Sequence, residues 1–317
     1  MPGFILRRIV LGVLTLFVVS LIIFAATQAL PGDPARSILG KTATPASLAA
    51  LREQLGLNRP VVAQYWDWLS GFVRGDLGDS LAADEPVSTL LGKRLENSAV
   101  LMLLAAIVSV PLAVLIGAVS ARRRDGPMDH ALSVVTLALA ALPEFVVGIA
   151  FVVFFATTVL TLLPAVSTIP PEDAPWRHPQ DLVLPTLTLV VAVTPYVARI
   201  MRASMVEVLE SDYVEMARLK GLAERAVVWK HALPNAIPPT IQVIAVNLAY
   251  LAGGIVVVEF VFGYAGIGAA LVDAVANRDI PVVQALAMLI AGLYVVLNLL
   301  ADIATILVTP RLRTSLP

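Results

Sequence analysis

The chain has 317 residues, of which 58% are hydrophobic and 14% are charged. Because soluble domains contain about 45 to 50% apolar and about 25% charged residues, this composition indicates a polytopic membrane protein. The formal net charge of −1 gives no reason to expect nucleic acid as a partner, and the absence of cysteine excludes disulfides, thiolate zinc sites and cysteine nucleophiles.

The first apolar run covers residues 9–32 and contains no charged residue. It exceeds the about 20 residues that a transmembrane helix needs and the about 7 to 15 residues of a signal-peptide core. We therefore predict an uncleaved first transmembrane helix, which together with the N-terminus makes up residues 1–30.

Residues 31–96 are predicted to form an ordered helical subdomain outside the membrane. Thr44 can cap a helix that begins at Pro45, and Gly56 is placed to end it. A second helix starts at Pro60 and aligns an apolar stripe made of Val61, Tyr65, Trp68, Leu69 and Phe72. Such a stripe more often serves packing than ligand binding, so we interpret it as the core of the subdomain, resting on the membrane face.

Five further apolar runs bring the predicted total to six transmembrane helices within a permease core at 97–308. The runs are 97–121, a third span from 131 past 155 that Pro143-Glu144 interrupts, 182–198, 240–258, and a segment between Asp279 and Asp302. An even number of spans puts both termini on one side. The two short loops on the other side hold only Arg177 and Arg278, so the positive-inside rule predicts cytoplasmic termini, including the tail 309–317.

Residues 203–239 contain a polar and basic island between the fourth and fifth spans. Asp212 can cap a short helix over 213–220, and Glu215 can reach back to the cap. One face of this helix is predicted to be apolar and holds Tyr213, Met216 and Ala217. The helix is therefore expected to be amphipathic.

Gly221 follows this first helix, at a position where a left-handed residue is favoured. A second helix over 223–232 is predicted to carry Lys230 and His231 in its last turn and to end at Pro234. The two helices would form a compact unit outside the membrane.

The spacing of Glu215, Ala217, Gly221, Leu233 and Pro234 resembles the EAA loop of ABC importer permeases, although Met216 and His231 replace the usual Ala and Ile. In that family the loop docks into a cleft of the cytoplasmic ATPase subunit. The resemblance implies that Glu215 and Arg218 make polar docking contacts, that Ala217 packs closely and that Gly221 forms the turn. The alternative is an amphipathic helix lying on the membrane surface.

Four further strings are similar to segments of the dipeptide, oligopeptide and nickel permease family. They are LPGDPA at 30–35, LREQLGLNRPVVAQY at 51–65, GDLGDS at 75–80 and NRDIPVVQ at 277–284. Two positions depart from the family. Tyr264-Ala265-Gly266 stands where Pro-Gly is usual, and Glu144 stands where a small or apolar residue is commoner.

The resemblance implies a multi-pass permease subunit of the bacterial inner membrane that imports di- or oligopeptides. Its implied partners are a second homologous permease, two ATPase domains and an external solute-binding protein, with ATP and magnesium bound on the ATPases and no cofactor in this chain. Nickel complexes or glutathione-like solutes are alternative cargoes. A secondary transporter in which Glu144 relays protons is a further alternative, but it would need matching broken helices in two repeat halves.

Three polar residues inside the spans are candidates for the translocation path. A carboxylate such as Glu144 near the middle of a span costs roughly 2.5 to 3.5 kcal/mol, so it should face the bundle interior or a wet cavity. It could meet the amino terminus of a peptide, or it could satisfy backbone groups freed by Pro143 or pair with a basic neighbour. For Asn247 and Asn298, interhelical hydrogen bonding is favoured over substrate contact.

No enzyme signature is present in the sequence. HExxH, a G-x-S-x-G elbow and paired membrane aspartates are all missing, and Gly40-Lys41-Thr42 lacks the first glycine of a phosphate loop. The chain is therefore predicted to be a transport subunit without a nucleotide site of its own.

Overall fold

In the computed structural model, the described residues are 2–29, 35, 39, 43–54, 56, 58–170 and 173–308, and they are almost entirely helical. Among them, five helices are long and apolar enough to cross a membrane. They are α1 (Pro2–Ala29), α5 (Val87–Arg122), α8 (Pro179–Leu209), α11 (Leu233–Phe262) and α13 (Ile280–Val308). A bent helix pair supplies a sixth candidate span, so the predicted helical membrane fold is confirmed.

Three predicted segments fall wholly or largely outside the described residues. They are the tail 309–317, the glycine-lysine-threonine string at 40–42 and most of the LPGDPA string at 30–35.

The third predicted span consists of two helices rather than one. α6 (Pro127–Ala140) and α7 (Glu144–Phe151) meet at an angle of 102°. The break falls at Pro143, which cannot donate a backbone hydrogen bond and which disfavours helical geometry in the residue before it. A π-helical turn, η2 (Val152–Thr157), follows α7. The sequence thus located the break, but nothing in it fixed the angle.

The second predicted span starts earlier than its apolar run. α5 begins at Val87 rather than at residue 97, because Val87 and Leu91 are buried against α12 (Ile267–Asn277) and α13. The charged side chains of this first part lie on its other faces, which is why the segment does not read as apolar.

α8 lies at the centre of the bundle. Of its most apolar stretch, 67% is buried inside the chain, against 11% for α1. It packs against α5 and α11 through a shared core that includes Leu101, Val193 and Ile255. α5 and α8 approach most closely at Gly117, where a Cβ atom would lie 2.7 Å from the carbonyl oxygen of Ala198. Only glycine therefore fits at this crossing.

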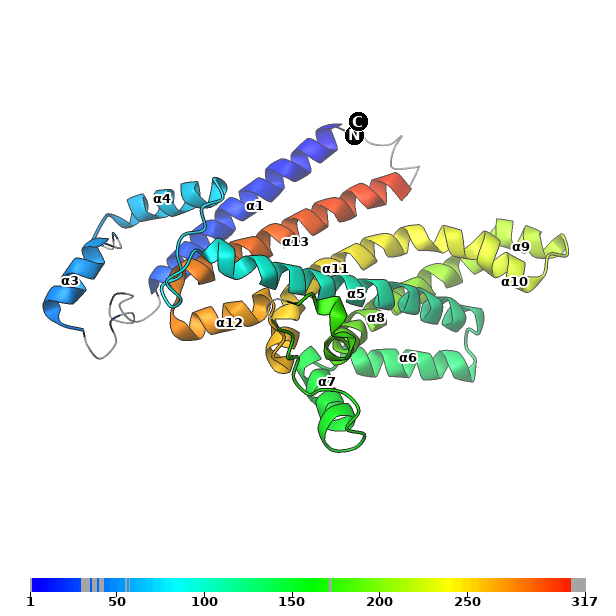
Figure 1. Cartoon of the computed structure of the whole chain (residues 1–317). Helices are drawn as coiled ribbons and strands as arrows, with labels where there is room; N and C mark the ends of the chain where they lie inside the picture. Colours follow the sequence, from blue (N-terminus) through cyan, green and yellow to red (C-terminus); the bar gives the residue numbers. More distant parts are fainter. Residues whose placement is uncertain are drawn as a thin grey trace.

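Both described ends of the chain lie on one side of the bundle (Figure 1). The start of α1 and the end of α13 are joined by an ion pair of 3.1 Å between Arg8 and Asp302. The same side carries α9 (Asp212–Leu219), whereas α3 (Pro45–Gln54) lies toward the opposite side.

The start of α3 forms as predicted. Thr44 Oγ1 accepts a hydrogen bond from the Ser47 backbone N–H at 3.2 Å, and Ser47 Oγ accepts one from the Thr44 N–H at 2.9 Å. This is a reciprocal cap in which serine takes the place of the usual glutamate. Gly56 has a φ of +65°, which confirms the predicted left-handed residue after the helix.

The apolar stripe of α4 (Val61–Val73) does not form the core of a separate subdomain. Tyr65 packs against Phe24 of α1 with ring centroids 5.4 Å apart, and its hydroxyl is hydrogen-bonded to Ser20 at 2.9 Å. Trp68 lies 5.7 Å from the same phenylalanine ring. The prediction was wrong because two short helices offer too little apolar surface to bury one another, whereas the long apolar side of α1 is adjacent.

Candidate functional site

α9 begins without the predicted capping box. Its N-cap is Ser211, no side-chain cap bond is present, and Asp212 and Glu215 both lie in the first turn. The Ser211 hydroxyl is turned back toward α8, where it donates to the carbonyl oxygen of Val208. The two carboxylates instead favour the helix through its positive N-terminal dipole.

The buried face of α9 also differs from the prediction. Val214 and Ala217 are buried, while Tyr213 and Met216 are 47% and 52% exposed. The prediction that Tyr213, Met216 and Ala217 share one apolar face was wrong. The buried pair at spacing i, i+3 is Val214 and Ala217, which lies one residue after the pair Tyr213 and Met216. Tyr213 and Met216, together with Leu219, form what we call the outer face of α9. An exposed apolar surface of this kind is typical of an interaction site.

The turn after α9 matches the prediction. Gly221 has a φ of +76°, and a Cβ atom placed there would meet nothing within 4 Å, so the requirement for glycine is conformational and not steric. The Gly221 N–H donates to the carbonyl of Arg218 at 2.9 Å, which closes the turn.

Arg218 braces this turn. Its Nη2 and Nε atoms contact the carboxylate of Glu224 at 3.1 and 3.2 Å, and its Nη1 atom donates to the carbonyl of Leu209 at 3.2 Å. The hydrogen bonds that Arg218 donates to Glu224 raise the pKa of Arg218 against the opposing effect of partial burial. One side chain therefore ties α9 to the end of α8 and to the start of α10 (Glu224–Ala226).

The second helix of the unit does not end at Pro234. α10, the π-helical turn η4 (Val227–Ala232) and α11 run on as one continuous helix from Glu224 to Phe262. The prediction was wrong because a π turn is wider than an α turn, and it moves the preceding carbonyls away from the proline ring and its missing N–H. Pro234 lies in the first turn of α11.

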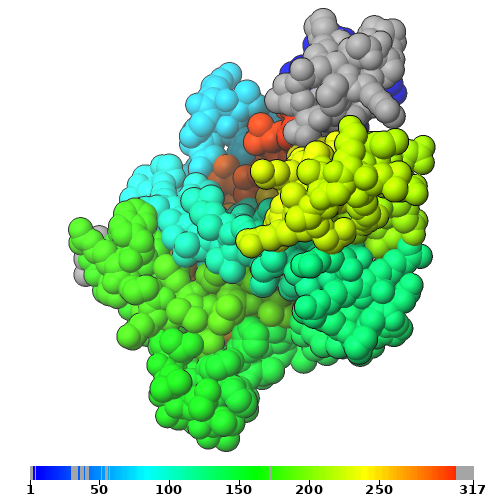
Figure 2. Space-filling view, turned by 90° about the vertical axis from the view of Figure 1, so that its right-hand side faces the viewer, coloured from blue at the N-terminus to red at the C-terminus, as the bar shows by residue number. Residues whose placement is uncertain are grey.

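The other predicted residues of this unit divide into buried and exposed groups. Leu233 packs against the buried cluster that joins α8, α9, η4 and α11, and whose members include Met201, Met205 and Val214. Glu215 and Pro234 are exposed, and His231 is half-buried. Viewed from this side of the bundle, the yellow-green residues of the unit lie beside the turn between α5 and α6, where Arg124 and Glu210 form an ion pair (Figure 2).

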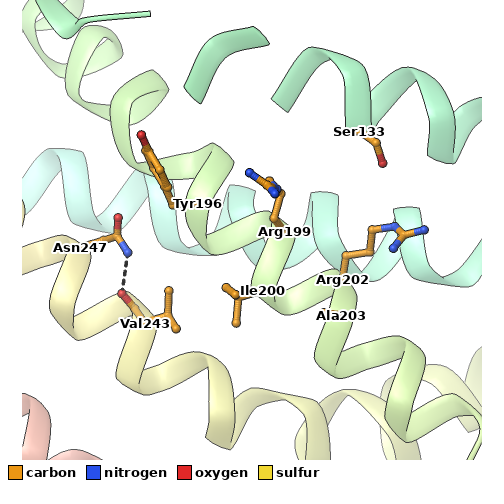
Figure 3. A pocket seen from close by; sticks show the side chains of 8 residues that line it. All are labelled: Ser133, Tyr196, Arg199, Ile200, Arg202, Ala203, Val243 and Asn247. Carbon is orange, nitrogen blue, oxygen red and sulfur yellow. Dashed lines mark hydrogen bonds between the residues drawn. The ribbon is translucent and has the colours of Figure 1, made fainter. Parts of the chain in front are cut away.

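A cavity of about 560 Å³ lies between α6, α8 and α11. Its lining comprises Ser133, Tyr196, Arg199, Ile200, Arg202, Ala203, Val243 and Asn247 (Figure 3). Of the three predicted path residues, only Asn247 contributes to it. The amide nitrogens of Asn247 and Asn298 donate within their own helices, to the carbonyls of Val243 and Tyr294, each at 2.8 Å. The predicted interhelical bonds from these two nitrogens are therefore wrong, because the nearest acceptor is a carbonyl one turn back.

Glu144 lies at the start of α7, outside this lining. Its Oε1 atom is 3.1 Å from the position that a Cβ atom of Gly254 would occupy, and Tyr250 of α11 is beside it. Among the described residues, Glu144 makes no ion pair, so the predicted pairing with a basic neighbour is not found.

The sequence did not single out the ion pair between α6 and α8. Arg202 binds Asp129 with both ends of its guanidinium, at 2.7 and 2.6 Å, and the Ser120 hydroxyl of α5 donates to the same carboxylate. Opposite charges near the ends of two apolar runs are a usable signal for such a pair, although they do not identify the partners.

Glu259 anchors the loop after α11. It is fully buried, and its carboxylate accepts hydrogen bonds from the Ser98 hydroxyl and from the backbone N–H groups of Gly268 and Ala269 at 2.7 and 3.3 Å. The side chain therefore anchors the loop and makes no contact with solvent. A Cβ atom at Gly266 would lie 2.1 Å from this carboxylate, which explains the glycine there.

Tyr264 accounts for the departure from Pro-Gly in this loop. Its side chain is fully buried, and its hydroxyl donates to the carbonyl of Asn97 at 2.7 Å. The Asn97 side chain in turn donates to the carbonyl of Ala265 at 2.8 Å. The tyrosine thus joins the loop to α5.

The described residues form a bundle of apolar helices with a compact helical unit on one side and a cavity beside the central helix, an arrangement that suits a membrane permease. The family described as binding-protein-dependent transport system inner membrane component matches residues 109–314, and the N-terminal component of the same system matches residues 1–114. The chain belongs to this family, which confirms the predicted ABC permease class.

The chain is similar along its whole length to named permeases. It is 42% identical to a probable peptide ABC transporter permease protein of Sinorhizobium fredii, over 99% of this chain and 100% of that protein. It is 34% identical to a putative peptide transport system permease protein of Brucella abortus and to the glutathione transport system permease protein of Escherichia coli K12, over 99% of this chain and of each of them.

The fold is also found among solved structures. A crystal structure described as an amino acid ABC transporter with histidines aligns with a TM-score of 0.50 at 17% identity, covering 72% of this chain and 94% of that chain. At this identity the likeness extends to the fold alone.

Proposed function

We propose that this chain is a transmembrane subunit of an ATP-driven importer of di- or oligopeptides delivered by a solute-binding protein. The observation that carries the proposal is the similarity to peptide permeases over 99% of the chain. We place the protein in the bacterial inner membrane with cytoplasmic termini and α9 on the cytoplasmic side. A second homologous permease, two ATPase domains that hold ATP and magnesium, and an external binding protein complete the assembly.

A glutathione-like cargo is the second candidate. Relatives described as glutathione permeases are 34 to 35% identical to this chain and match it over the same 99% of its length. Glutathione carries amide bonds and free carboxylates, so one path could accept both cargoes, and the choice between them would fall largely to the binding protein.

In the proposed mechanism, the outer face of α9 is the contact with an ATPase subunit. Glu215 and Met216 of α9 are exposed, while Ala217 is buried in the cluster that joins α9 to its neighbouring helices. His231, Leu233 and Pro234 support α9 from the second helix. Because the buried cluster joins α9 to α8 and α11, a displacement of α9 would move the helices that line the cavity.

Arg218 is proposed to act as an internal brace as well as a docking residue. Its guanidinium is already engaged by Glu224 and by the Leu209 carbonyl, but 41% of its side chain remains exposed to a partner. Glu144, Asn247 and Asn298 stay candidates for the path. Asn247 has the strongest support of the three, because it lines the cavity.

The test is uptake into proteoliposomes that hold the two permeases and the ATPases, with binding protein outside. We expect ATP-dependent accumulation of radiolabelled trialanine. Uptake driven by a proton gradient without ATP would refute the proposal. Accumulation of glutathione with exclusion of trialanine would favour the second candidate.

A further inference from the structure

We propose that Arg199 binds the C-terminal carboxylate of the transported peptide in the cavity between α6, α8 and α11. This inference rests on the proposed function and adds a specific binding group to it. Arg199 is the charged group of this site, and Asn247 and Ser133 are further polar residues of the same lining on the other two helices.

The charge of the cavity lining is the first observation. Two arginines line it and no acidic residue does. Arg202 is neutralised by Asp129, which is buried and faces away from the cavity. Among the described residues no ion pair or side-chain hydrogen bond engages Arg199, and arginine stays protonated at all relevant pH values. The cavity therefore holds one uncompensated positive charge.

The position of Arg199 is the second observation. It lies in α8, directly after the predicted apolar run 182–198, and its guanidinium points away from the helix axis into the space toward α6 (Figure 3). The side chain is exposed, so the guanidinium is accessible to an anion that enters the cavity. Arg202, one turn further on, is paired with Asp129 within the chain. Arg199 is therefore the arginine of the lining that is available to the carboxylate of a bound peptide.

The cavity also offers neutral hydrogen-bond donors to a peptide. The Asn247 amide uses one of its two hydrogens on the Val243 carbonyl, which leaves the other free, and the Ser133 hydroxyl lines the same space. A guanidinium can hold both oxygens of a carboxylate in parallel. Tyr196 does not compete as a donor, because its hydroxyl donates to the carbonyl of Ala140 at 3.1 Å. Its ring forms a wall of the site.

The size and the opposite charge of Glu144 fit a small peptide. A volume of about 560 Å³ lies within the about 300 to 1,000 Å³ that is usual for small-ligand sites. Glu144 contacts α11 at Gly254, seven residues from Asn247, which is about 10 Å along a helix. Glu144 of α7, outside the cavity lining, and Arg199 of α8, within it, are an anion and a cation that suit the two ends of a zwitterion.

The experiment compares Arg199→Gln, Arg199→Lys and the wild type in the assembled complex. Radiolabelled trialanine with a free C-terminus and trialanine amide are the two probes. Binding of each is measured by equilibrium dialysis against the nucleotide-free complex without binding protein, so that selection by the binding protein plays no part. Uptake of trialanine with binding protein and ATP is measured in parallel. Arg177→Gln is the control, since Arg177 is 71% exposed in the external loop and lies outside the cavity lining.

For Arg199→Gln we expect a loss of at least about tenfold in affinity for trialanine, the size of one charge-assisted contact, and no change for trialanine amide. Arg199→Lys should retain part of the preference, and Arg177→Gln all of it. Equal loss for both probes would overturn the inference in favour of a structural role. No loss for either would mean that Arg199 reaches lipid headgroups or the second permease instead. Absence of any peptide uptake by the wild type would refute the proposed function separately.

Discussion

Replacement of Gly221 tests whether the turn after α9 sets the orientation of that helix for coupling. Its φ of +76° is a left-handed conformation, and a side chain there would meet nothing within 4 Å. The penalty for Gly221→Val is therefore backbone strain alone, about 1 to 2 kcal/mol for an L-residue. An energy of this size shifts the ratio of aligned to misaligned loop by a factor of about 5 to 30.

We expect the variant to assemble with its partners and to support ATP hydrolysis, but to take up several times less peptide per ATP. The measurement is the ratio of trialanine uptake to phosphate release in proteoliposomes. Gly75→Val is the matched control, because Gly75 has a φ of +86°, has equally open space around its Cβ position and lies in the turn after α4. Normal coupling in Gly221→Val, or an equal loss in Gly75→Val, would refute the reasoning.

Three further variants test the other sites. Glu259→Ala leaves the buried Gly268 N–H, the partly buried Ala269 N–H and the Ser98 hydroxyl without their acceptor. The loss should cost about 1 to 3 kcal/mol for each buried group left unpaired and lower the melting temperature of the purified chain. An unchanged melting temperature would contradict the anchoring role. Asp129→Asn removes the counter-charge of Arg202 and should destabilise the folded chain. The cost should be less than the about 3 to 5 kcal/mol of a fully buried pair, because the Arg202 side chain is 31% exposed. The double variant with Arg202→Met should recover part of the lost stability in the same melting assay. Glu144→Gln should reduce uptake of cationic relative to neutral peptides, and an unaltered preference in competition assays would remove Glu144 from the path.

Local signals in the sequence were sufficient where one residue controls the backbone. Pro143 located the break between α6 and α7, Thr44 located the start of α3, and the φ values of Gly56 and Gly221 follow from their places after helices. These features depend on dihedral preferences and on capping, which act over a few residues.

Signals failed where the outcome depends on a neighbouring helix. Which face of α9 is buried depends on where Met205 of α8 lies, and the stripe of α4 found its partner in Phe24, which is distant in the sequence. Pro234 did not end its helix because a π turn, which no local residue specifies, accommodated it. The burial of Glu259 depends on three donors that only the fold brings together around its carboxylate.

The two candidate sites share one segment of α8. Met201 and Met205 lie under α9 in the buried cluster, and Tyr196 and Arg199 line the cavity on the same stretch of helix. All of them follow Pro195, a proline inside α8, where the helix lacks a backbone donor and bends most readily. Arg199 and Met205 are six residues apart, which is about 9 Å along the axis. A force on α9 therefore reaches the cavity through less than two turns of continuous helix. Met205, in the cluster under α9, and Arg199, in the proposed peptide site, are connected directly by α8, without another element between them.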